Sequence, residues 1–76
     1  MAAKAYILIE TQVGKSRDVA TALRAMPGVP TVDIITGAFD IIVLVEAADM
    51  VSMADLVTGQ VQSISGVTRT ITCVAA

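Results

Sequence analysis

The 76-residue sequence predicts an α+β fold in which four antiparallel strands form one sheet and two helices cover one of its faces. Three observations lead to this prediction. Segments with strand-like alternation and segments with helix-like spacing follow one another in the order β-α-β-β-α-β. The two halves of the chain repeat the same apolar pattern. The central predicted strands are apolar on both faces, which indicates that both faces are covered.

The first half of the chain begins with one strand and one helix. Residues 4–11 are rich in β-branched and aromatic side chains and precede the helix breaker Gly14, which is typical of a strand. Residues 16–26 carry apolar side chains at helical spacing with charges on the opposite side. Pro27-Gly28 ends this predicted amphipathic helix.

The middle of the chain is predicted to form a β-hairpin. Residues 29–36 and 40–47 have the composition of strands, and only residues 37–39 separate them. A connection this short forces the two strands to run antiparallel as neighbours.

A second helix and a last strand complete the chain. Asp49 is suited to cap the start of this helix, and Ser65-Gly66 closes it before a strand at residues 67–75. Gly59 lies inside the helix, where it costs about 1 kcal/mol relative to Ala, so we expect close packing of the helix on the sheet there. The apolar stripe of the helix consists of Met53, Leu56, Val57, Val61 and Ile64.

The two halves of the chain are similar in sequence. Residues 7–10 match residues 43–46 at an offset of 36, and the apolar positions of residues 19–29 match those of residues 57–67 at an offset of 38. A repeated βαβ unit with right-handed crossovers and a central hairpin closes into the ferredoxin-like βαββαβ sandwich.

The chain has more apolar residues than a small domain of this kind can bury. Apolar residues other than Gly make up 55% of the chain. The average for soluble domains is about 45–50% even when Gly is counted as well. In the first strand Ile7 and Ile9 lie on one face and Tyr6 and Leu8 on the other, but the helices cover only one face. An exposed apolar patch marks an interface, so we expect dimerisation through the open sheet face.

Charge and composition exclude several classes of protein. The longest stretch without a charged residue, 56–68, is shorter than the about 18 apolar residues of a membrane span and contains Gly, Gln, Ser and Thr. The start of the chain shows no signal-like cleavage pattern, so we expect a cytoplasmic protein without membrane contact. A net charge of −2, five basic residues without a run and two aromatic residues argue against direct nucleic-acid binding.

The sequence offers little for metal or cofactor chemistry. There is no His and a single Cys, Cys73, which excludes a disulfide framework and a Cys/His metal site within one chain. We expect Cys73 to be a small buried apolar residue and expect no cofactor. Gly14-Lys15-Ser16 resembles the end of a phosphate-binding loop, but that pattern requires a Gly at position 9, where the residue is Ile9.

Two features are candidates for ligand binding. Asp40 follows the hairpin turn, where it is either a turn residue with a local hydrogen bond or a carboxylate that binds an ammonium group beside loop amides. Thr68, Thr70 and Thr72 recur at every second position of the last strand, where they form either a half-buried edge or a polar pocket lining.

These residues resemble the effector-binding domain of the leucine-responsive (Lrp/AsnC) regulators, known as the RAM domain. The resemblance rests on the βαββαβ order, on the turn and strand at residues 36–43 (TGAFDIIV), and on the pattern at residues 65–72 (SGVTRTIT). It covers nearly the whole chain, so we expect a single RAM-like domain over residues 1–76 without a helix-turn-helix domain.

The resemblance implies an oligomer that binds an amino acid. Family members dimerise through their sheets, assemble into octamers or decamers, and bind amino acids between dimers near the hairpin. In this sequence Asp40 would bind the ligand ammonium and the amides near Gly37 its carboxylate, and Thr70 and Thr72 would line the pocket. The implied ligand-binding residues are Thr36, Gly37, Ala38, Phe39, Asp40, Thr70 and Thr72.

The function that the resemblance implies is non-enzymatic control of amino acid metabolism or transcription, with a DNA-binding Lrp/AsnC relative as an implied partner. Two alternatives stay open. One is a structural oligomerisation or adaptor module without a small ligand. The other is a cofactor-free enzyme of the same fold, although the sequence contains no plausible acid/base pair.

Overall fold

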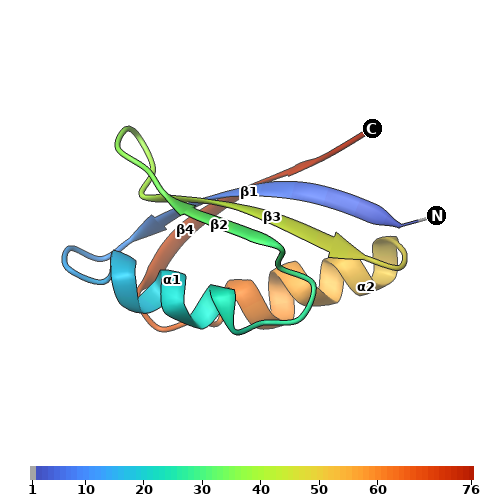
Figure 1. Cartoon of the computed structure of the whole chain (residues 1–76), viewed down its shortest axis with the longest axis horizontal. Helices are drawn as coiled ribbons and strands as arrows, with labels where there is room; N and C mark the ends of the chain where they lie inside the picture. The colour runs from blue at the N-terminus through green and yellow to red at the C-terminus, as the bar shows by residue number, and fades with distance from the viewer. Residues whose placement is uncertain (1) are drawn as a thin grey trace.

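The computed structural model describes residues 2–76 and confirms the predicted order of elements. The elements are β1 (Ala3–Thr11), α1 (Ser16–Arg24), β2 (Thr31–Ile34), β3 (Ile41–Ala47), α2 (Met50–Ala54), the π-helical segment η1 (Asp55–Val61) and β4 (Val67–Val74). The strands form one sheet in the order β2-β3-β1-β4, and every neighbouring pair is antiparallel. Both helices lie on the same side of the sheet (Figure 1), so the fold is the ferredoxin-like sandwich.

The core lies between the sheet and the helices, as the apolar periodicity predicts. The side chains of β1 and β3 that face the helices are fully buried, because these two strands occupy the centre of the sheet. The predicted stripes of both helices pack against them. The buried apolar residues are Ala5, Ile7, Ile9, Val19, Ala20, Leu23, Val32, Ile41, Val43, Val45, Met53, Leu56, Val57 and Val61.

The second helix begins at the predicted cap but changes its winding. The Asp49 carboxylate accepts a hydrogen bond from the Ser52 backbone N–H at 2.8 Å. From Asp55 onward the segment winds as a π-helix, and the Gln62 N–H donates to the Val57 carbonyl at 3.1 Å. The prediction that Gly59 packs closely on the sheet is wrong. A Cβ at Gly59 would meet no atom within 4 Å, because this residue lies on the outer side of the segment.

The opposite face of the sheet, which we call the open face, carries apolar side chains in two adjacent rows. Register places Tyr6 beside Leu44 and Cys73 in one row, and Leu8 beside Ile42 and Ile71 in the next. No part of residues 2–76 covers this face with a helix (Figure 1), and Tyr6 and Ile71 are each 42% exposed. The predicted apolar character of both faces is therefore confirmed.

Cys73 corrects one expectation from the sequence. Its side chain is exposed rather than buried. The reason is its position, since β4 is an edge strand and Cys73 pairs with Tyr6 on the open face.

The connection between β2 and β3 is longer than predicted, because β2 already ends at Ile34 and β3 begins only at Ile41. β2 also begins later than predicted. Pro30, which cannot donate to a strand ladder, directly precedes β2. The connection spans residues 35–40 and is closed by the Ile35 N–H, which donates to the Asp40 carbonyl at 2.9 Å. This loop rises above the sheet on the side away from the helices (Figure 1).

Within residues 2–76, the helices are too short to cross a lipid bilayer.

Candidate functional site

The Asp40 carboxylate holds the hairpin against β1. Its Oδ2 accepts a hydrogen bond from the Thr11 backbone N–H at 2.8 Å, and the Asp40 N–H donates to the Ile9 carbonyl at 2.9 Å. These bonds join residues distant in sequence, so the local turn bond considered from the sequence is not what is found. Among the hydrogen bonds within residues 2–76, none engages Oδ1 of this half-buried carboxylate. One oxygen of Asp40 therefore remains available to a ligand.

Thr11 extends this contact to the first helix. Its side-chain oxygen lies 3.4 Å from Oδ2 of Asp40 and 2.9 Å from Oγ of Ser16, the first residue of α1. Thr11 is the buried polar residue at the end of β1. The hairpin, β1 and α1 thus meet in one small polar network. No local sequence pattern indicated Thr11 or Ser16, because the network depends on the pairing of strands.

A second contact joins the hairpin to β4. The Arg69 guanidinium carbon lies 4.9 Å from the centre of the Phe39 ring, within the range of a cation–π interaction. Arg69 pairs with Glu10 on the neighbouring strand β1, so its side chain reaches across β1 to the hairpin. Sequence reasoning missed Arg69. Of the remaining turn residues, Thr36, Gly37 and Ala38 are exposed.

The threonines of β4 do not form the expected single row. Thr70 and Thr72 pair with Ile9 and Ile7, whose side chains face the helices. Thr68 lies at a register shift opposite the end of β1, and its hydroxyl donates to Glu10 Oε1 at 2.8 Å. The bulge therefore takes Thr68 out of the alternation, because an extra residue reverses the direction of the side chain.

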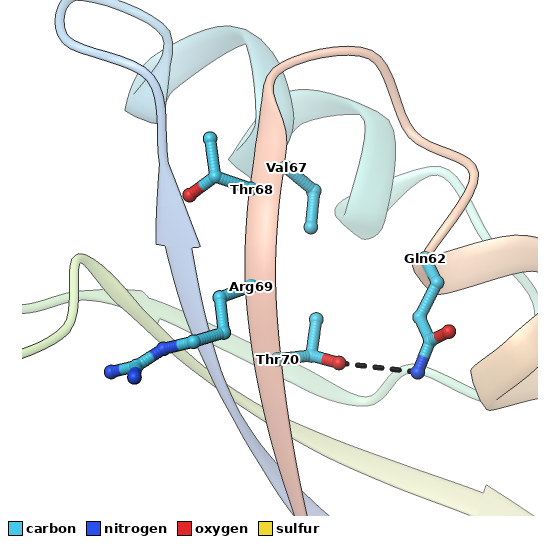
Figure 2. A pocket seen from close by; sticks show the side chains of 5 residues that line it. All are labelled: Gln62, Val67, Thr68, Arg69 and Thr70. Carbon is cyan, nitrogen blue, oxygen red and sulfur yellow. Dashed lines mark hydrogen bonds between the residues drawn. The ribbon is translucent and has the colours of Figure 1, made fainter.

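A hollow of about 290 Å³ lies between the end of η1 and β4. Its lining consists of Gln62, Val67, Thr68, Arg69 and Thr70. Figure 2 shows that the side chains of Gln62 and Thr70 point toward each other, and the Gln62 amide nitrogen lies 3.2 Å from the Thr70 hydroxyl. The side chains of Thr68 and Arg69 point to the other side of the strand. Sequence reasoning identified Thr70 here but not Gln62.

The two groups of candidate residues lie on opposite sides of the sheet. The hairpin rises on the side of the open face, whereas Thr70 and Thr72 face the helix side. The hollow that Thr70 lines contains no residue of the hairpin, whereas the Asp40 carboxylate reaches Thr11 beside Ser16 of α1.

The sites differ in the chemistry they can support. The hairpin provides a carboxylate oxygen and backbone amides, and the hollow provides an amide and a hydroxyl. Among residues 2–76, no three His, Cys, Asp or Glu side chains gather as a metal site would require. Both sites therefore carry groups that are able to hydrogen bond to a small polar molecule.

Sequence comparison places this arrangement in a known family. The family model described as the Lrp/AsnC ligand binding domain matches residues 4–76, and the chain belongs to this family. The resemblance seen in the hairpin and in the last strand is thereby confirmed. A comparison with curated protein sequences found no significant match.

Solved structures agree with the family assignment. FFRP-DM1 is 31% identical with a TM-score of 0.95, over 97% of this chain and 99% of that chain. A hypothetical protein from Pyrococcus horikoshii is 32% identical with a TM-score of 0.92, over 100% of this chain and 90% of that one. A transcriptional regulator from Neisseria meningitidis, solved as a complex with L-Met, is 21% identical with a TM-score of 0.86. The match covers 97% of this chain but 49% of that regulator.

Proposed function

We propose that this chain is a non-enzymatic domain that binds a free amino acid, oligomerises and thereby takes part in the control of amino acid metabolism or transcription. The observation that carries the proposal is the hairpin of a Lrp/AsnC ligand binding domain with one oxygen of Asp40 unengaged by residues 2–76. The Neisseria regulator and a feast or famine regulatory protein from Mycobacterium tuberculosis, 20% identical, were both solved with L-methionine. These complexes support a ligand of the amino acid class and leave the particular amino acid open.

In the proposed complex, Asp40 Oδ1 accepts hydrogen bonds from the ligand ammonium. The amides of Thr36, Gly37, Ala38 and Phe39 surround the ligand carboxylate, since exposed loop N–H groups form anion-binding concavities. Thr70 and Thr72 of a neighbouring copy line the other side. The hollow at Thr70 contains no hairpin residue of the same chain, which supports a ligand that lies between copies.

The assembly proposed for this site begins with a dimer that packs two open faces together. Dimers then associate into an octamer or a decamer, and the amino acid binds where they meet. A ligand shifts the assembly only through its different affinities for the assembled and dissociated states. A DNA-binding Lrp/AsnC relative in the cytoplasm is the proposed macromolecular partner.

Calorimetric titration with each of the twenty amino acids tests this proposal, together with light scattering of the assembly. We expect saturable binding of at least one amino acid, and Asp40→Asn to weaken it about tenfold to a hundredfold, because the variant loses a hydrogen bond to a charged group. The Asn side chain retains an oxygen acceptor for the Thr11 N–H, so the hairpin should stay in place.

Asp18→Asn is the matched control, since Asp18 is an exposed carboxylate on α1 with no hydrogen bond to the hairpin within residues 2–76. If no amino acid produces heat and none changes the assembly, the sensing proposal is wrong and the scaffold alternative is favoured. Equal loss of binding in both variants would show that overall charge, rather than Asp40, matters.

A further inference from the structure

The hollow between η1 and β4 differs in chemistry from the hairpin. Its polar side-chain groups are the Gln62 amide and the Thr70 hydroxyl, 3.2 Å apart, and Val67 adds an apolar wall. The polar groups are neutral and can both donate and accept hydrogen bonds. After this hydrogen bond forms, each of the two side chains still has a free donor or acceptor, whichever way the Gln62 amide is turned.

No charged side chain among residues 2–76 points into this hollow. Arg69 contributes to the lining, but Figure 2 shows its side chain on the other side of β4, and the guanidinium lies against Phe39. Gln62 is exposed in the single chain. Once a second copy covers the hollow and excludes water, a charged group placed there would lack a counter-charge, which is unfavourable. A wholly apolar group would leave the amide and the hydroxyl without their second partners.

The size of the hollow fits one small molecule. A volume of about 290 Å³ lies at the lower end of the range for ligand pockets, about 300–1,000 Å³. A carboxamide matches the contents best. Its N–H₂ and C=O pair with the amide and hydroxyl in a mutual arrangement, and its methylene groups can pack against Val67.

We infer that this hollow receives the side chain of an uncharged, hydrogen-bonding amino acid, and that a carboxamide side chain (Gln or Asn) is preferred over apolar or charged ones. The inference rests on the proposed function, because the hairpin of a second copy is required to bind the ammonium and carboxylate of the same ligand. It adds the chemical class of the side chain and assigns Gln62 as the residue that selects it.

Titration of the native oligomer with Gln, Asn, Leu, Met, Glu and Lys tests the inference. We expect Gln or Asn to bind about tenfold more tightly than Leu, Met, Glu and Lys, the difference that one or two neutral hydrogen bonds provide. Gln62→Leu replaces the side chain by a branched apolar one that is one bond shorter and removes its polar groups. We expect it to abolish the preference for the carboxamide or to reverse it toward Leu and Met.

Gln60→Leu is the matched control, because Gln60 is exposed on η1 and does not line the hollow. It should leave the preference unchanged. Tighter binding of Met, Leu or a charged amino acid by the unmodified protein overturns the inference but not the proposed function, and so does an unchanged preference in Gln62→Leu. Absence of binding by every amino acid in this panel overturns the inference, and absence of binding by all twenty overturns the proposed function as well.

Discussion

Gly28→Ala is expected to destabilise the fold strongly, because this glycine combines an unusual backbone conformation with close packing. Gly28 has a φ of 83°, and its carbonyl accepts a hydrogen bond from the Glu46 N–H at 2.8 Å. An added Cβ would lie 2.8 Å from the Glu46 carbonyl oxygen and 3.4 Å from Leu56 Cδ2. The first contact is with backbone and cannot be relieved by a rotamer change.

The magnitude follows from three contributions. A left-handed conformation costs an L-residue about 1–2 kcal/mol. Overpacking against a well-packed neighbour costs about 1–3 kcal/mol, and lengthening the bond to Glu46 costs about 1 kcal/mol. We therefore expect a loss of about 4 kcal/mol in the free energy of unfolding, a large part of the about 4–11 kcal/mol typical of a domain this size.

Gly14→Ala separates these contributions. Gly14 has nearly the same φ, 82°, but an added Cβ would meet no atom within 4 Å. It should lose only the conformational cost of about 1–2 kcal/mol. Urea denaturation at one protein concentration measures both variants, since assembly contributes to apparent stability. Equal losses in the two variants would refute the argument that contact with β3 makes Gly28 necessary.

Two further predictions concern the open face and the cap of α2. Leu8→Lys places a charge at the centre of the open face, so we expect monomers by analytical ultracentrifugation, whereas Val51→Lys, 75% exposed on α2, should leave the dimer intact. A Leu8→Lys variant that remains dimeric would contradict dimerisation through the open face. The hydrogen bonds from Ser52 hold the pKa of Asp49 below its ordinary value of 3.8. The cap therefore contributes stability above about pH 4, and this stability is lost as pH falls through the folded-state pKa of Asp49. Asp49→Ala should lower the Tm at pH 7, but it should leave the Tm unchanged at a pH well under about 3. A pH-independent difference in thermal unfolding would show that the carboxylate charge is not involved.

The sequence was sufficient for the order of elements and for the faces they bury. The stripe at Met53, Val57 and Val61 and the cap at Asp49 depend on periodicity and local hydrogen bonding, which a single segment expresses by itself. The family also followed from local patterns, namely the hairpin and the last strand. The fold and the family could therefore be predicted before any contact was known.

The site itself depended on tertiary structure. The bond from Thr11 to Asp40 and the contact of Phe39 with Arg69 join segments 29 and 30 residues apart, which no local pattern encodes. The bulge at Thr68 and the pairing of Gln62 with Thr70 likewise depend on strand register and on the path of η1. Even the exposure of Cys73 follows from the place of β4 at the edge of the sheet.

The sequence by itself thus determined which residues are apolar, where chain direction changes and which surfaces require cover, because these are properties of neighbours along the chain. The tertiary structure alone decided which side of the sheet each candidate residue faces. It placed Thr68 and Thr70 on opposite sides of β4, because the bulge opposite the end of β1 interrupts the alternation of side chains along the strand.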